Sequence, residues 1–101
     1  MTKDKALGYL GLAARGRRAV SGEFQTEEAV HAKTARLVII ASDASDNTRK
    51  KFRNMCEHAG IPFMERYDRE TLGRCVGKDF RAVAAILDEG LANAFRASAG
   101  M

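Results

Sequence analysis

Hydrophobic positions in the first third of the chain follow helical spacing, interrupted by one short extended segment. Between Ala6 and Ala14 they recur every three or four residues, which predicts a helix that ends at Gly16. Residues 19–22 predict a brief extended piece. A second helix is expected over roughly residues 23–33, beginning at Ser21 or Gly22, with an apolar side formed by Phe24, Ala29, Val30 and Ala32.

The clearest strand is the continuous apolar run Leu37–Ala41, which is rich in β-branched residues. Because such a run has no polar face, we expect helices to cover both sides of the strand. The polar residues 42–48 are typical of a helix start and predict a third helix over about 46–59. Gly60 and Pro62 end this helix, since glycine favours helix termination and proline cannot continue the helix.

Strands and helices continue to alternate in the second half of the chain. Residues 62–65 predict a short strand, Asp68 begins a helix that ends at Gly77, residues 82–87 predict a buried strand, and residues 88–90 begin the last helix. This alternation predicts an α/β protein, a three-layer α/β/α sandwich around a small mixed four-stranded sheet. A chain of 101 residues has the length of one domain, so residues 1–101 are expected to form a single domain.

Positive charge is concentrated in the N-terminal half. The net charge is +4, and residues 1–53 contain eleven Lys/Arg against six Asp/Glu, whereas residues 54–101 contain six against seven. The excess comes from two clusters, Arg15–Arg18 and Arg49–Arg53. Such clusters neutralise phosphates in nucleic-acid-binding proteins, and they also occur as solvated surface that promotes solubility. Charge alone leaves both interpretations open.

Neither a membrane segment nor a metal site is indicated. The apolar runs are far too short to span a bilayer, and the N-terminus lacks a secretory signal, so we expect a cytoplasmic protein. Cys56 and Cys75 stand 19 positions apart without CxxC spacing, and His31 and His58 add no ligand pattern. The cysteines are therefore expected to be free thiols on apolar helix faces, and no cofactor is predicted.

The sequence does not contain a recognisable catalytic constellation. The turn after the best strand has no glycine-rich loop and no phosphate-binding lysine, and the chain has no GxSxG motif. Asp43 and Asp46 suit helix capping far better than acid–base catalysis, because carboxylates at a helix start accept from free N–H groups. We therefore expect that the protein is not an enzyme.

Five motifs stand in order along the chain, at residues 5–12 with 20–23, 35–43, 61–63, 72–77 and 88–92. They resemble segments of the large-subunit ribosomal protein L7Ae family, which includes the L30e-type ribosomal proteins and a bacterial branch of YlxQ type. Residues 5–12 with 20–23 are similar to the LLGLAxRAxKVVSGE opening of the bacterial branch, and the segment 35–43 resembles AKLVIIAxD. The remaining matches are 61–63 with IPxxxV, 72–77 with LGrxxG, and 88–92 with DxGfA. The resemblance covers nearly the whole chain and implies an α/β/α sandwich that binds RNA kink-turns, in which two stems meet at a sharp bend.

The resemblance also implies where RNA binds. In this family the start of the second helix, with the signature G-x-N-E-x-x-K, enters the RNA groove and reads guanines. Gly22 matches the signature, whereas Phe24, Gln25 and Glu28 replace its asparagine, glutamate and lysine. The loop that covers extruded nucleotides corresponds to residues 78–81. The implied RNA-binding residues are Gly22, Phe24, Gln25, Glu28, Lys33, Arg36, Ser45, Arg49, Arg74, Lys78, Phe80 and Arg81.

Several interpretations of single residues stay open at this point. Phe80 suits either stacking on a splayed base or packing in the core, and Arg17 and Arg18 are expected to flank the same surface. The favoured function is recognition of bent RNA in the ribosome or a messenger leader by a monomer. The alternative is a protein–protein adaptor that has lost kink-turn affinity, because an exposed Phe24 among carboxylates would suit a protein partner.

Overall fold

The computed structural model describes residues 4–100, over which five helices and four strands alternate in the predicted order. No helix within these residues has both the length and the apolar character needed to cross a membrane. The elements are α1 (Lys5–Arg15), β1 (Ala19–Ser21), α2 (Glu23–His31), β2 (Leu37–Ile40), α3 (Asp46–Ala59), β3 (Phe63–Glu65), α4 (Arg69–Cys75), β4 (Val83–Ile86) and α5 (Glu89–Ser98).

The four strands form one mixed sheet in the order β1-β4-β2-β3. β4 runs antiparallel to both of its neighbours, and β2 pairs in parallel with β3. Strands β1, β2 and β3 therefore point the same way, and β4 points back. We call the end where β1, β2 and β3 finish and β4 begins the proximal end, and the opposite end the distal end.

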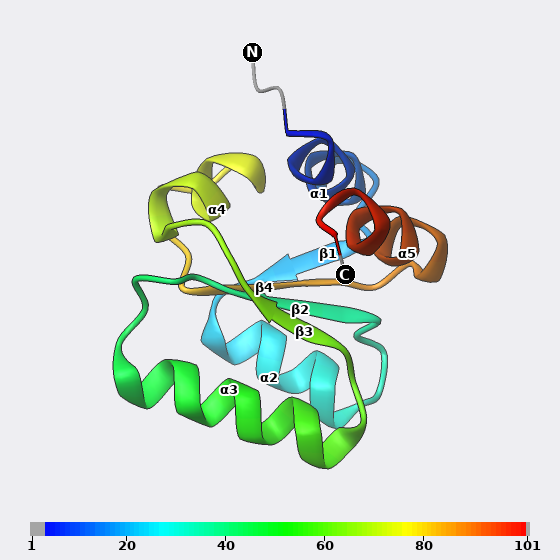
Figure 1. Cartoon of the computed structure of the whole chain (residues 1–101). Coiled ribbons are helices and arrows are strands. Elements are labelled where there is room, and N and C mark those ends of the chain that lie inside the picture. The colour runs from blue at the N-terminus through cyan, green and yellow to red at the C-terminus, as the bar shows by residue number, and fades with distance from the viewer. Residues whose placement is uncertain (1–3, 101) are drawn as a thin grey trace.

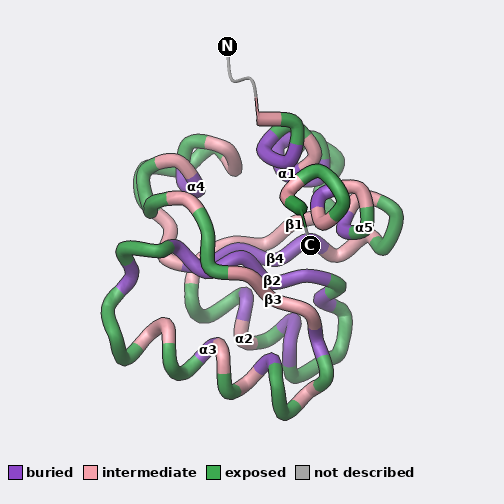
Figure 2. Tube along the Cα trace, in the orientation of Figure 1, coloured by how far each residue is buried: buried purple, intermediate pink, exposed green. Residues whose placement is uncertain are grey.

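Helices cover both faces of this sheet. In Figure 1, α1, α4 and α5 lie on one face, and α2 and α3 lie on the other. This arrangement confirms the predicted α/β/α sandwich with a small mixed four-stranded sheet. The central strands β2 and β4 are buried along their whole length, as the tube in Figure 2 shows.

The apolar run in β2 fills both layers because alternate side chains of a strand point to opposite faces. Leu37 and Ile39 belong to the core beneath α1, α4 and α5, and Val38 and Ile40 belong to the core above α2 and α3. All four side chains are fully buried. This explains why the strand carries no polar position.

Local sequence signals fix the ends of α3 where the sequence predicts them. The Ser45 hydroxyl accepts from the N–H of Thr48 at 3.2 Å and so caps the helix start. At the other end Gly60 adopts the left-handed conformation, with a φ of 72°, which glycine tolerates without steric cost.

The predicted apolar side of α2 is wrong at Phe24 and Ala32, which are both exposed. The buried positions are Thr26, Ala29 and Val30, which are spaced three and four residues apart and form one helical stripe. Phe24 precedes Thr26 by two residues and therefore points away from this stripe. Its side chain is 74% exposed and so is available to a partner.

Candidate nucleic-acid interface

The proximal end of the sheet gathers the starts of α2 and α3 with the loop before β4. The N–H of Gly22 donates to the carbonyl of Val83 at 2.9 Å, and the N–H of Ala41 donates to the carbonyl of Ala82 at 2.7 Å. The first bond extends the pairing of β4 with β1 by one residue, and the second extends the pairing of β4 with β2 by one residue. Segments that are about sixty and forty residues apart in sequence are thus held side by side.

The start of α2 differs from that of the other helices in residues 4–100 because no side chain caps it. Its cap residue is Gly22, with a φ of 87°, and the first helical bond runs from the N–H of Thr26 to the Gly22 carbonyl. The other helices are capped by the side chains of Asp4, Ser45, Asp68 and Asp88. The first-turn N–H groups of α2 therefore remain available to an external acceptor.

Arg81 places a cation beside this uncapped start. Its Nε donates to the Oγ of Ser21 at 3.1 Å, and its Nη1 donates to the carbonyl of Phe80 at 2.8 Å. A Cβ placed on Gly22 would lie 3.7 Å from the Nε, so the Arg81 side chain packs directly over the glycine. Within residues 4–100 no carboxylate pairs with Arg81.

The loop that carries Arg81 rests on α4. The N–H of Lys78 donates to the carbonyl of Gly73 at 2.7 Å, and the N–H of Arg81 donates to the carbonyl of Arg69 at 3.0 Å. A Cβ placed on Gly73 would lie only 2.5 Å from the Asp79 carbonyl oxygen, so this close approach requires glycine. The Phe80 side chain is 61% exposed, so it does not pack in the core. Stacking on a splayed base is the interpretation that remains.

Several predicted residues at the start of α3 have internal partners. Ser45 serves as the helix cap, and the Nε of Arg49 donates to the carbonyl of Ala44 at 3.1 Å. Arg49 also forms an ion pair with Asp46. The Thr48 hydroxyl donates to Glu23 at 3.5 Å and so links the starts of α3 and α2. Arg49 consequently has little free charge to offer a ligand.

Phe24, Gln25 and Glu28 lie together on the exposed side of α2. They line a shallow groove beside the edge strand β1, with Val20 and Leu87 as its apolar floor. Phe24 and Gln25 belong to the first turn of the helix and flank the N–H groups left without a cap. Glu28 lies one turn further along the same side.

The structure does not bring all twelve predicted residues together. Lys33 follows the end of α2, and the N–H of Arg36 donates to the carbonyl of Ile86, so both lie at the distal end. Arg18 is also distal and pairs with Asp88 at 2.8 Å. Arg74 lies on α4 and pairs with Glu70 at 3.0 Å. The residues gathered at the proximal end are Gly22, Phe24, Gln25, Ser45, Arg49, Lys78, Phe80 and Arg81.

Sequence reasoning missed two participants at the proximal end. Ser21 anchors Arg81, and Glu23 bonds to Thr48 across the gap between α2 and α3. Ser21 belongs to the VSGE motif, so the motif itself contains the signal. Its partner Arg81 lies sixty residues away, and that pairing follows only from the fold.

The thiols and acidic side chains do not assemble into a reactive site. Cys56 is a free, buried thiol, and burial raises its pKa to about 11. Cys75 is also free, its Sγ lies 3.1 Å from the Leu7 carbonyl, and burial raises its pKa as well. Thiols with raised pKa values are poor nucleophiles and poor metal ligands at neutral pH. Among residues 4–100 no group of three or more His, Cys, Asp or Glu side chains could hold a metal ion.

Two known proteins are similar to this chain in sequence. The chain is 42% identical over 84 residues to the RNA-binding protein YlxQ of Bacillus subtilis (strain 168), covering 83% of this chain and 84% of that protein. It is 32% identical over 90 residues to the RNA-binding protein YlxQ of Enterococcus faecium, covering 89% and 86%.

Solved structures show the same fold. A protein of unknown function from Bacillus halodurans C superposes with a TM-score of 0.92 at 37% identity, covering 98% of this chain and all of that one. The 15.5kD RNA binding protein of Giardia lamblia superposes with a TM-score of 0.79 at 24% identity, covering 99% and 89%. Because its identity is only 24%, the second structure supports the fold and nothing further.

A family model provides the assignment. The model described as "Ribosomal protein L7Ae/L30e/S12e/Gadd45 family" matches residues 4–95. This is not an enzyme family, which agrees with the prediction that the protein is not an enzyme. The match and the two YlxQ relatives confirm the resemblance seen in the motifs, and the chain therefore belongs to the ribosomal protein L7Ae/L30e/S12e/Gadd45 family, in its YlxQ branch.

Proposed function

We propose that the chain is a cytoplasmic, monomeric RNA-binding protein that recognises kink-turns or similarly bent RNA in ribosomal RNA or a messenger leader. The observation that carries this proposal is the uncapped start of α2 beside the unpaired guanidinium of Arg81. Backbone N–H groups at a helix start together with a neighbouring cation form a strong hydrogen-bond donor site for phosphate and guanine oxygens. The YlxQ relatives are named as RNA-binding proteins, which supports the same partner.

Each group of proximal residues would make a different kind of contact with the RNA. The first-turn N–H groups of α2 would donate to RNA, and the Gln25 amide would bond to a guanine edge. Phe24 and Phe80 expose aromatic faces on which unpaired bases stack. Lys78 and Arg81 would neutralise phosphates.

One of the three acidic residues near the start of α2 is neutralised by a cation. Glu27 forms an ion pair with Lys51 at 2.9 Å, and the hydrogen bond from Lys51 lowers the pKa of Glu27. Glu23 accepts from the Thr48 hydroxyl, which leaves its charge in place. Glu23 and Glu28 are both exposed and have no ion-pair partner in residues 4–100, so these two carboxylates would repel RNA.

The decisive experiment is a titration of a labelled kink-turn hairpin and of an uninterrupted duplex of equal length at several salt concentrations. We expect the kink-turn to bind at least about tenfold more tightly than the duplex, since helix and loop read the bend rather than charge alone. Equal affinity for both RNAs, or no binding to either at physiological salt, would overturn the kink-turn proposal.

A protein–protein adaptor is the second candidate, and the exposure of Phe24 favours it. An aromatic side chain above an apolar groove is a common anchor for a protein partner. Kink-turn titrations of the unaltered protein and of the Phe24→Ala variant distinguish the two functions. RNA recognition predicts that this change weakens kink-turn binding, whereas an adaptor predicts no kink-turn binding even in the unaltered protein.

A further inference from the structure

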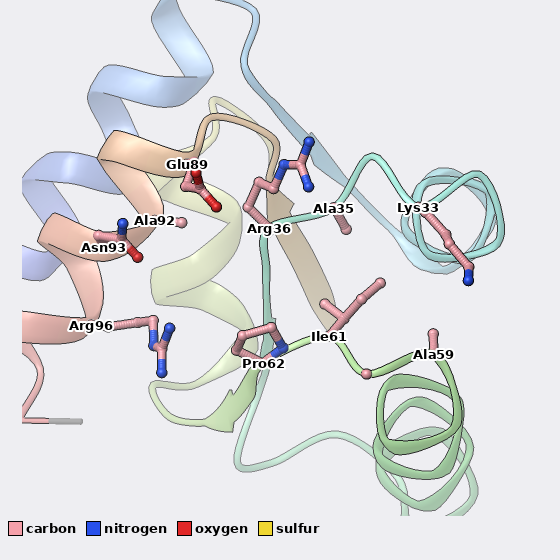
Figure 3. A pocket seen from close by; sticks show the side chains of 11 residues that line it. Lys33, Ala35, Arg36, Ala59, Ile61, Pro62, Glu89, Ala92, Asn93 and Arg96 are labelled. Carbon is pink, nitrogen blue, oxygen red and sulfur yellow. The ribbon is translucent and has the colours of Figure 1, made fainter.

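The distal end of the molecule contains a cationic hollow that the proximal site does not use. It has a volume of about 320 Å³. Figure 3 shows that its three cations come from the three layers: Arg96 from α5, Arg36 from the segment before β2, and Lys33 from the end of α2. The hollow therefore crosses the end of the sheet from one helical layer to the other.

The charges around this hollow are not balanced by the protein. None of Lys33, Arg36 and Arg96 forms an ion pair within residues 4–100. Glu89 is the one carboxylate residue among the lining residues. The lining thus has three cationic side chains and one anionic side chain at neutral pH, and the excess favours an anion.

Arg96 supplies a second, independent sign of a missing acceptor. Its Nε is buried and has no hydrogen-bond partner among the described residues. A buried donor without an acceptor is unfavourable, and native structures generally satisfy such groups. A phosphate oxygen in the hollow would provide an acceptor for this side chain.

A second depression adjoins the hollow. It lies between α2 and α3, shares Lys33 and Ala59 with the hollow, and adds Lys51, His31 and His58 to the lining. Lys51 is already paired with Glu27, so Lys33 is the cation without an ion pair that both depressions share. The two depressions together form an elongated track, a shape that fits a chain of phosphates better than a single small anion.

Geometry separates this track from the proximal site. Gly22 bonds to Val83 at the first residue of β4, and Arg36 bonds to Ile86 at the last. The two ends are therefore about 10 Å apart along the strand and face in opposite directions. The start of α2 and the distal hollow are therefore separate surfaces at opposite ends of β4.

We propose that Lys33, Arg36 and Arg96 form a second RNA-contact surface, which binds the phosphodiester backbone of a segment other than the one bound at the start of α2. The choice of RNA as the partner rests on the proposed function, and the anion site itself rests on the geometry of the distal end. Such a chain would hold two segments of a folded RNA at once, one by its bend and the other by its phosphates.

The test adds a labelled plain RNA duplex to protein that is already saturated with an unlabelled kink-turn hairpin. We expect the saturated protein to bind the duplex at low salt, and Lys33→Gln with Arg36→Gln to weaken this binding at least about fivefold. We also expect the slope of log affinity against log salt to fall by about two, one for each phosphate that is no longer neutralised. Affinity for the kink-turn hairpin should stay within about twofold, since both residues are remote from the proximal site.

A matched control removes the same charge elsewhere. Lys5 and Lys50 are exposed and have no ion pair in residues 4–100, so Lys5→Gln with Lys50→Gln lowers the net charge equally. If both double variants weaken duplex binding equally, only net charge matters and the distal site is refuted. Failure of the saturated protein to bind the duplex would refute it as well. Arg96→Gln, checked for a native circular dichroism spectrum, should act in the same direction as the distal pair.

The outcomes also separate the two proposals. If the kink-turn hairpin binds no better than the duplex, the proximal proposal fails, and the duplex titration is then run on the free protein with the same variants. Amide chemical shifts give a direct map: duplex binding should perturb residues 33–36 and 89–96. Perturbations confined to residues 22–28 and 77–82 would overturn the distal proposal while leaving the proximal one intact.

Discussion

The Nε of Arg81 donates to the hydroxyl of Ser21 across 3.1 Å and so joins the loop before β4 to the residue that precedes the start of α2. The bond holds a guanidinium over Gly22, next to N–H groups that no side chain caps. A flexible cation would lose conformational entropy on binding RNA. Because Arg81 is already oriented, less of this entropy remains to be lost.

Arg81→Gln is expected to weaken kink-turn binding by about tenfold, because it removes a charged phosphate contact worth on the order of 1–2 kcal/mol. The slope of log affinity against log salt should fall by about one. Ser21→Ala keeps the charge but removes its anchor, and we expect a smaller loss of about threefold. Anisotropy titrations measure both changes, with Lys50→Gln as the control for net charge. An Arg81→Gln protein with unaltered affinity would remove this residue from the site.

Restoring the family signature should strengthen RNA binding. The triple change Phe24→Asn, Gln25→Glu and Glu28→Lys recreates G-x-N-E-x-x-K on α2, and replaces a repulsive carboxylate with a cation. All three side chains are exposed, so the fold should tolerate the change. We expect the triple variant to bind the kink-turn at least about tenfold more tightly. Glu28→Lys alone should strengthen binding by about threefold for any RNA sequence, because it adds a phosphate contact. A triple variant that gains equally for plain duplex would show that charge, and not recognition, accounts for the gain.

Gly73 should be intolerant of any side chain. A Cβ at this position would meet the Asp79 carbonyl oxygen at 2.5 Å, so Gly73→Ala must displace the loop that carries Lys78 and Arg81. We expect a loss of about 1–3 kcal/mol in the free energy of unfolding, measured by urea denaturation, together with weaker RNA binding. Gly8→Ala is the matched control. It lies in α1 with open space around it, and should stabilise the protein by about 0.5–1 kcal/mol.

Local signals in the sequence suffice for the elements and their ends. The β-branched run 37–40, the cap at Ser45 and the stop at Gly60 each act through their own backbone, so the sequence alone predicts β2 and α3. Local sequence signals do not determine whether Phe24 is buried or exposed. Whether it or Thr26 faces the sheet depends on how α2 is rotated against β4, and that rotation is fixed by contacts distant in sequence.

The candidate site is predictable only in part for the same reason. The motif around Gly22 marks the start of α2, but nothing near it indicates that Arg81 is its neighbour. Lys33 and Arg36 are close to α2 in sequence, yet they lie at the far end of the sheet because α2 and β2 each run its full length. The resemblance implies that both cations bind RNA together with Gly22, whereas the structure places them at the opposite end of the sheet.

The hydroxyl of Tyr67 provides a test of how the N-terminal helix is anchored. It donates to the Oδ2 of Asp4 at 2.8 Å, and Asp4 also caps α1 by accepting from the N–H groups of Ala6 and Leu7. Partial burial opposes ionisation of Asp4, but these hydrogen bonds outweigh it and lower the pKa of the carboxyl. Burial and the bond to Asp4 raise the pKa of Tyr67 to about 12.

Because the pKa of Asp4 is lower in the folded protein, its ionisation contributes stability above its ordinary pKa near 3.8, and this contribution is lost as the pH falls further. The raised pKa of Tyr67 contributes stability below pH 10, which is lost between pH 10 and 12. Tyr67→Phe should therefore lower the free energy of unfolding by about 1 kcal/mol at pH 7. Urea denaturation should show the difference shrinking as the pH falls below 3.8 and Asp4 becomes protonated in the folded protein as well. A difference that stays constant from pH 7 down to the lowest pH at which both proteins remain folded would mean that Tyr67 stabilises the fold through ring packing against Phe95 rather than through Asp4.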